Sequence, residues 1–157
     1  MSETAKTYVS LLREAYKGEL LGEALFATMA ARDDLREHAA SLSVLCAIEA
    51  RTARTLQPLV EEAGITIDDA DDTRRLGRDL GAVDGSWDDL VKALHDALPS
   101  FLADFARLRE LAPDPHDPAL AALIAHEQTI SAFAQLELAG HTDVSHALLT
   151  RYLETAP

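Results

Sequence analysis

Apolar residues recur at intervals of three and four along several long stretches of the chain, with polar residues between them. The clearest stretch runs from Leu42 to Val60. One helical face of this stretch carries, in order, Leu42, Leu45, Glu49, Thr52, Leu56 and Leu59. Such a stripe is typical of a helix that faces a protein core, yet a carboxylate stands at its middle. Burial of a carboxylate costs free energy unless it is protonated, ion-paired or bound to a metal. If Glu49 is buried, the residues that it faces therefore bear directly on function.

Capping residues, glycines and prolines between these stretches predict five helices. Asp34 and Glu37 have the spacing of a capping box, and Asp117 stands directly before Pro118, which favours the first position of a helix. We therefore predict four long helices over residues 2–31, 34–63, 86–111 and 117–139, with N-caps at Ser2, Asp34, Ser86 and Asp117. A short fifth helix over residues 143–155 is expected to lie across one end of the others.

Residues 65–85 separate the second and third of these helices and differ from the rest of the chain in composition. They are acidic, poor in bulky apolar side chains and interrupted by Gly77, Gly81 and Gly85. An extended segment of this length can span the whole length of a long helix. We therefore predict a crossover, with one helical turn near residues 73–80, that makes the second and third long helices parallel.

Composition narrows the fold class and the partners. The 157 residues suit a single domain, 1–157, and 48% apolar residues with only 7 Gly favour an all-α protein. With 14 Lys and Arg against 27 Asp and Glu, the formal charge is −13, which repels nucleic acid and anionic membranes. No apolar run approaches the roughly 18 residues that span a bilayer. Cys46 is the single cysteine, and the N-terminal residues lack the apolar core of a signal peptide, so we expect a cytoplasmic protein.

Three glutamates stand on stripes that are otherwise apolar. Glu19, Glu49 and Glu127 each lie near the middle of a predicted helix, so they fall at similar heights in a helical bundle. Clustered, buried carboxylates are candidates for a metal site or an acid–base site. The alternative is that they are protonated, or hydrogen-bonded to neighbours such as Thr52 and His126, without any further function.

Two other acidic residues, Glu23 and Glu137, stand nearer to the edges of their stripes, and we expect both to be partly solvated. The chain contains no Gly-rich phosphate loop, no Ser/His/Asp arrangement and no CxxC pair. The sequence therefore gives no support for nucleotide binding or for nucleophilic catalysis.

Three segments around the glutamates, together with the long crossover, resemble the ferritin-like superfamily, in particular its rubrerythrin and small di-iron hydroxylase branches. They are YKGELLGEALF in the first helix, LCAIEARTARTLQPL in the second and AHEQTISAFAQLELAG in the fourth. The resemblance implies an up-down four-helix bundle with a di-iron or di-manganese centre. In that family, helices 1 and 3 each give one Glu, and helices 2 and 4 each give Glu-x-x-His. Glu19, Glu49 and Glu127 match the ligand positions of helices 1, 2 and 4.

The chain departs from this ligand set at both histidine positions, which Thr52 and Ile130 occupy. The nearest histidine, His126, precedes Glu127 and is rotated from it by about 100° around the helix axis. The resemblance therefore implies an incomplete, degenerate metal site in this chain.

The third predicted helix offers no inward carboxylate. Its apolar stripe presents Phe101 at the level of the glutamates, while Asp96 and Asp104 lie on its flanks. Three carboxylates and one imidazole are a poor di-metal cage, although such a set can hold one cation. The candidate metal ligands are Glu19, Glu49, Glu127 and His126.

Two functions from different classes fit these observations. The first is a ferritin-like bundle that has lost most of its di-metal site, carries no cofactor and serves as a binding or interaction module for an unidentified ligand. The alternative is a metal-dependent oxidoreductase that uses iron or manganese at the remaining carboxylates.

Apolar residues off the main stripes bear on association. One four-helix core does not need all of them, and exposed apolar patches often mark self-association. We therefore predict a homodimer through the first and second helices, based on Val9, Leu21, Leu25 and Val44.

Overall fold

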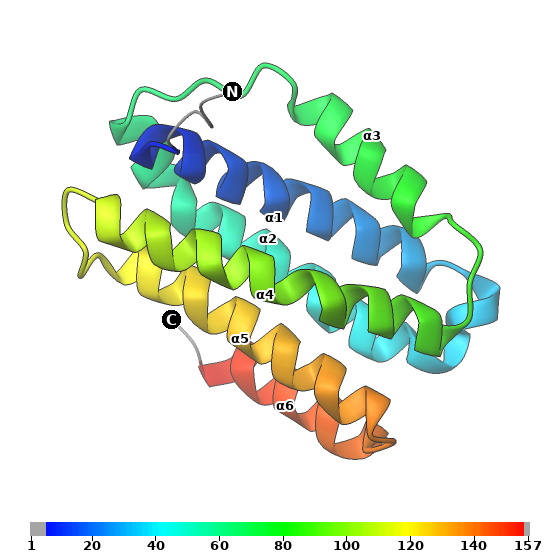
Figure 1. The fold of residues 1–157 in the computed structure, drawn as a ribbon. Coiled ribbons are helices and arrows are strands. Elements are labelled where there is room, and N and C mark those ends of the chain that lie inside the picture. The colour runs from blue at the N-terminus through cyan, green and yellow to red at the C-terminus, as the bar shows by residue number, and fades with distance from the viewer. Residues whose placement is uncertain (1–5, 156–157) are drawn as a thin grey trace, which may run out of the picture.

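The computed structural model describes residues 6–155, and every regular element within this range is a helix (Figure 1). The predicted all-α fold class is confirmed. The elements are α1 (Tyr8–Ala30), the short 3₁₀ helix η1 (Asp33–His38), α2 (Ala39–Glu62), α3 (Ala70–Gly81), α4 (Trp87–Leu111), α5 (Pro118–Leu138) and α6 (Thr142–Thr155). None of them combines the length and the apolar character that a bilayer crossing requires.

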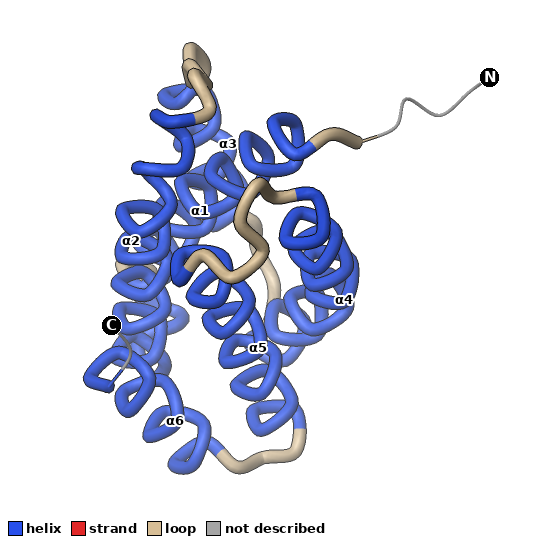
Figure 2. Tube along the Cα trace, turned by 90° about the vertical axis from the view of Figure 1, so that its left-hand side faces the viewer, coloured by secondary structure: helices blue, strands red, loops and turns tan. Residues whose placement is uncertain are grey.

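The four long helices run side by side. α1 packs antiparallel to α2, and α4 antiparallel to α5, while contacts of α2 with α5 and of α1 with α4 join the two pairs (Figures 1 and 2). The segment between α2 and α4 brings the chain back along the length of the helices. As a result, α2 and α4 run in the same direction, as the sequence predicted (Figure 1).

Side-chain caps begin three of the helices. The Ser86 hydroxyl accepts from an amide in the first turn of α4, and the Asp117 carboxylate does so for α5, as predicted. The predicted N-cap of the first helix, Ser2, lies outside the described residues. The N-cap of α1 is Thr7, which forms a capping box with Ser10.

The predicted capping box at Asp34 is wrong. Residues 33–38 form the 3₁₀ helix η1, and α2 begins only at Ala39, where no side chain caps the helix. The Asp34 carboxylate instead accepts two hydrogen bonds from the Arg32 guanidinium, whose third nitrogen donates to the carbonyls of Gly81 and Val83. Asp34 thus helps Arg32 to close the C-terminal end of α3.

Helix α3 is longer than the single turn that the sequence predicted. It packs on α1 through a face whose buried residues are Thr73, Gly77 and Gly81. A Cβ atom at Gly77 would lie 2.4 Å from the Leu21 carbonyl oxygen, and one at Gly81 would lie 2.7 Å from the Leu25 carbonyl oxygen. The glycines therefore permit a close helix–helix contact instead of interrupting a loop.

We expect Gly77→Ala to lower the free energy of unfolding by about 2 kcal/mol, because the new methyl group meets α1 backbone that cannot move aside. Gly18→Ala is the matched control, since Gly18 is also helical but a Cβ added there would meet no atom within 4 Å. The control should gain about 1 kcal/mol from helix propensity. Urea unfolding and hydrogen exchange of the α3 amides measure both changes; equal gains in the two variants would contradict the prediction.

Helix α6 follows the side of the other helices, and the prediction that it crosses one end is wrong. It runs back along α5 and also contacts α2 (Figure 1). Ser41, near the start of α2, hydrogen-bonds to His146, while Arg51, further along α2, donates to the Leu153 carbonyl. Because these contacts are well separated along both helices, α6 lies alongside α2.

The apolar core consists of two clusters at opposite ends of the helices. One contains residues such as Leu12, Leu56 and Leu123, and the other contains residues such as Ile48 and Ile130. In three of the four long helices the residues between the clusters include buried polar side chains, namely Glu19, Glu49, Thr52, His126 and Glu127. The fold thus places one polar layer between two apolar ones.

The exposed apolar surface on which the homodimer prediction rests is smaller than the sequence indicated. α3 covers α1 at Leu21 and Leu25, and Leu25 and Val44 pack against the core, whereas Val9 is 39% exposed. The homodimer stays a prediction, to be checked by light scattering. A monomer at micromolar concentration would contradict it.

Candidate functional site

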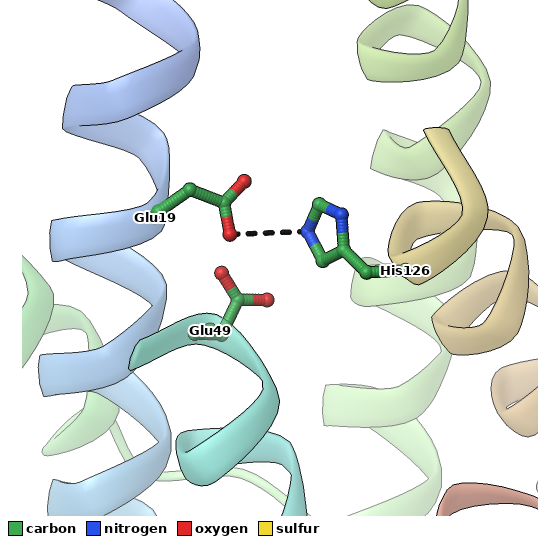
Figure 3. Close-up of side chains that lie close together, drawn as sticks. All are labelled: Glu19, Glu49 and His126. Carbon is green, nitrogen blue, oxygen red and sulfur yellow. Dashed lines mark ion pairs between the residues drawn. The ribbon is translucent and has the colours of Figure 1, made fainter. Parts of the chain in front are cut away.

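Three buried side chains from three helices converge in the polar layer. Glu19 from α1, Glu49 from α2 and His126 from α5 point toward one another (Figure 3). Each offers one potential ligand atom, and these atoms all lie within 4.8 Å of one another. The side chain of Glu127, also buried, adds a third carboxylate, with Oε2 3.2 Å from Nε2 of His126. The four residues singled out from the sequence are therefore brought together.

The backbone fixes the orientation of the His126 ring. Its Nδ1 lies in close contact with the Leu123 carbonyl oxygen, one helical turn earlier. A carbonyl oxygen only accepts, so Nδ1 carries the hydrogen and donates it. In a neutral ring, Nε2 then holds a free lone pair, and it faces Glu19 Oε2 at 3.1 Å. Although His126 and Glu127 are rotated from each other on α5, their side chains bend to the same point.

Two atoms at the centre of the cluster lack a hydrogen-bond partner. Among the buried side-chain atoms of residues 6–155, these are Glu19 Oε2 and His126 Nε2. They lie at ion-pair distance, as the dashed line in Figure 3 marks, but not in hydrogen-bond geometry. Buried polar atoms nearly always have a hydrogen-bond partner, so two neighbouring atoms without one mark a place where a further group could bind.

A glycine makes room for one of the carboxylates. A Cβ atom at Gly22 of α1 would lie 2.5 Å from Glu49 Oε2 and 2.7 Å from Glu49 Cδ. Any other residue at position 22 would therefore displace the Glu49 carboxylate. Gly22 was not among the residues predicted from the sequence, although an isolated glycine inside an apolar helix is a signal that something approaches closely.

Burial dominates the electrostatics of the cluster. It raises the pKa of Glu19 well above the usual value, opposed by a hydrogen bond with Glu49. Burial also raises the pKa of Glu49 well above its usual value, helped by the charge of Glu19 and opposed by His126. For Glu127, burial raises the pKa to about 7, again opposed by His126. The cluster therefore holds protons more tightly than carboxylates in water do.

The residues around the cluster are apolar or already bonded. The Thr52 hydroxyl donates to the Ile48 carbonyl within α2, and Ile130 is buried in the apolar core, so neither contributes a free ligand. From α4, the Phe105 ring lies beside His126, with ring centroids 6.3 Å apart. Phe101, expected at this level, is instead 48% exposed.

The acidic residues of α4 face away from the cluster, as the sequence predicted. Asp96 lies near Lys92 and His95, and Asp104 pairs with Lys6 at 2.8 Å. All of these contacts are at the surface. The candidate site therefore draws its carboxylates from α1, α2 and α5 alone.

The prediction that Glu137 is partly solvated is wrong. Glu137 is 7% exposed and accepts hydrogen bonds from Trp87 Nε1 at 2.9 Å and from the Ser145 hydroxyl at 2.6 Å. The cause is α6, which covers the end of α5 and supplies Ser145. Because its carboxylate is satisfied by these donors, Glu137 ties α4, α5 and α6 together. Glu23 is partly exposed, as expected.

The raised pKa of Glu127 predicts a pH dependence of stability. Its folded-state value of about 7 exceeds the usual 4.5, so the folded protein binds this proton more tightly than the unfolded chain. The resulting stabilisation is complete below about pH 4.5 and is lost as the pH rises through about 7. In metal-free protein we expect the free energy of unfolding to fall by about 3 kcal/mol over this window.

Urea unfolding at a series of pH values measures this change. Glu127→Gln should remove that part of the slope, whereas the exposed control Glu14→Gln should keep it. An unchanged slope in Glu127→Gln would contradict the assignment of this proton to Glu127.

Comparison of the chain with protein-family models, with curated proteins and with solved structures found no match. The geometry of the cluster is therefore the basis on which its function rests.

Proposed function

We propose that this protein binds one divalent transition-metal ion, of the iron or manganese type, through Glu19, Glu49 and His126. Glu127 lies beside them, with Oε2 3.2 Å from Nε2 of His126. The observation that carries the proposal is the unpaired couple Glu19 Oε2 and His126 Nε2, buried and facing each other. A cation between them would satisfy both atoms at once.

The distances and the donor types suit such an ion. Atoms that share one ion at about 2.1 Å lie roughly 3 to 4.2 Å from one another, close to the spacing found here. Two carboxylates with one imidazole, and no thiolate, favour manganese and iron over softer metals. The space that Gly22 leaves for the Glu49 carboxylate also supports a built site, since a larger residue would close it.

Charge balance favours the same proposal. Three carboxylates in one buried layer repel one another and must otherwise hold protons or an imidazolium. A divalent cation would allow these protons to leave, so metal binding should release protons and strengthen as the pH rises. Bound iron or manganese would supply one-electron redox chemistry. The chain's own residues would hold the ion, keep it from bulk water and, at Glu127, carry a proton near neutral pH.

The ferritin-like resemblance is consistent with this proposal, because a one-metal site can derive from a di-metal site. Four long helices with α2 and α4 parallel are the arrangement that the resemblance implies (Figure 1). Thr52, Ile130 and the outward carboxylates of α4 account for the absence of a second set of ligands in the described layer. The centre would then be a one-metal remainder of a di-metal site.

A second candidate is a bundle that binds no metal and serves as an interaction module. The favouring observation is that His126 Nε2 lies 3.1 and 3.2 Å from two carboxylate oxygens, which is also ion-pair distance. An imidazolium at His126 would then balance part of the negative charge.

Metal loading separates the two candidates. Protein purified without chelators is incubated anaerobically with Fe(II) or Mn(II), desalted and analysed for metal, and its unfolding temperature is measured with and without the ion. The proposal expects about one ion per chain and a higher unfolding temperature. The control Asp96→Asn changes an exposed carboxylate and should bind as the wild type does. Absence of both bound metal and stabilisation would favour the second candidate.

A further inference from the structure

A groove of about 520 Å³ runs along the surface of α1, between α2 and α3. Helix α1 lies between these two helices (Figure 2). Its residues form the floor of the groove. Cys46 of α2 stands on one wall, and two arginines of α3 stand on the other. The lining residues are Leu20, Glu23, Ala24, Ala27, Thr28, Ala31, Cys46, Arg74 and Arg78. The volume is in the range that small-molecule ligands occupy.

Apart from the Glu23 carboxylate, the side chains that α1 contributes to the groove are apolar, or they are hydrogen-bonded within the helix. Ala24, Ala27 and Ala31 leave the space open. The Thr28 hydroxyl donates to the Ala24 carbonyl, and the Cys46 thiol donates to the Glu23 carbonyl. These two groups therefore need no hydrogen-bond partner from a ligand. The floor suits the hydrocarbon or aromatic part of a ligand.

The α3 wall carries two positive charges, and these form few ion pairs with other residues of the chain. Arg74 and Arg78 stand one helical turn apart, so both reach the same side of α3. Arg74 lies 3.8 Å from the fully exposed Asp71, a surface pair of little strength. Arg78 has no ion pair among the residues described by the structure. In a chain of formal charge −13, two such guanidinium groups beside an apolar floor are complementary to an anion.

We propose that this groove binds a small carboxylic acid with an apolar body. The carboxylate would lie against Arg74 and Arg78, and the body would lie over Ala24 and Ala27. Glu23, on the opposite side, disfavours a second negative group, so the ligand class is a monocarboxylate with one charged end. The proposal concerns the surface of α1 and does not depend on metal in the buried cluster.

Decanoate serves as the probe, used below its micelle concentration, and decanol of the same chain length is its uncharged match. Binding is followed by titration calorimetry, and by the rate at which neutral iodoacetamide alkylates Cys46, the single cysteine and a groove residue. We expect decanoate to bind at least about tenfold more tightly than decanol, because charged hydrogen bonds to arginine add to the apolar contact. Bound decanoate should also slow the alkylation of Cys46.

Two variants and one control test the assignment. Replacing both arginines, Arg74→Gln with Arg78→Gln, should weaken decanoate binding at least about tenfold and leave decanol unchanged. Arg75→Gln is the control, since Arg75 lies on the same helix, pairs with Asp72 and does not line the groove. Ala27→Leu, at an exposed position, should fill the floor and weaken both probes.

Three results would overturn the proposal. The first is equal binding of decanoate and decanol, which would remove the role of the arginines. The second is undiminished decanoate binding in the double arginine variant, or in Ala27→Leu if the double variant does not fold. The third is the absence of both decanoate binding and Cys46 protection in the wild type.

Discussion

Glu49→Gln should abolish the stabilisation that Fe(II) or Mn(II) gives to the wild type. The substitution keeps the shape of the side chain and removes one ligand charge at the centre of the cluster. Loss of a ligand should weaken metal binding at least about a hundredfold. At a free metal concentration of about 100 times the wild-type Kd, the wild type gains about 2.7 kcal/mol, whereas the variant should gain less than about 0.5 kcal/mol.

The same substitution has the opposite effect on metal-free protein. Glu49 is buried beside Glu19, and the repulsion between them helps to raise the pKa of Glu49. Glutamine removes this repulsion, so the free energy of unfolding of the metal-free variant should be unchanged or rise by up to about 2 kcal/mol. The two signs separate a ligand from a residue that merely supports the fold.

Elemental analysis and thermal unfolding, each with and without added metal, measure both effects. The exposed control Asp104→Asn should behave as the wild type in both states. Near-stoichiometric metal that survives in Glu49→Gln would show that Glu49 is no ligand. A wild type that never takes up metal would instead favour the metal-free interaction module.

The long apolar stripes of the sequence carried most of the information about the fold. A period of 3.6 identifies helices wherever one face is buried, and the proline and cap residues before α4 and α5 set their first turns within a residue or two. The prediction of secondary structure failed in residues 65–85, where contacts with a distant helix determine the local structure. Gly77 and Gly81 were interpreted as interruptions of a crossover with a single helical turn. Their actual role, a close approach of α3 to α1, involves a helix far away in sequence.

The candidate site was predictable in its residues but not in its geometry. A glutamate on an apolar stripe is visible in sequence, and Glu19, Glu49 and Glu127 were found in this way. His126 was also named as a candidate ligand, but its orientation was not predictable, because its rotation from Glu127 suggested divergence. The contact of Nδ1 with the Leu123 carbonyl turns Nε2 into the cluster. Glu137 was expected to be partly solvated because it stands nearer the edge of its stripe. It is buried by α6, whose course along the side of α5 no local pattern reveals.

Gly22→Ala should weaken metal binding about 10- to 100-fold with little change in the stability of the metal-free protein. The added Cβ would lie 2.5 Å from Glu49 Oε2, which is too close, so the flexible carboxylate must move away. Displacing a ligand without removing it costs affinity on this scale, as loss of supporting contacts does. The fold itself gains up to about 1 kcal/mol from helix propensity, which offsets the cost of shifting the side chain.

Gly18→Ala is the matched control, because Gly18 lies one turn earlier on α1 and a Cβ there meets no atom within 4 Å. It should raise stability by about 1 kcal/mol and leave metal affinity unchanged. Titration of metal-free protein with Mn(II), followed by calorimetry, compares the three proteins directly. If Gly22→Ala binds the ion as tightly as the wild type, the Glu49 carboxylate does not hold metal from the position that Gly22 leaves open, and the proposed ligand set loses its α2 member.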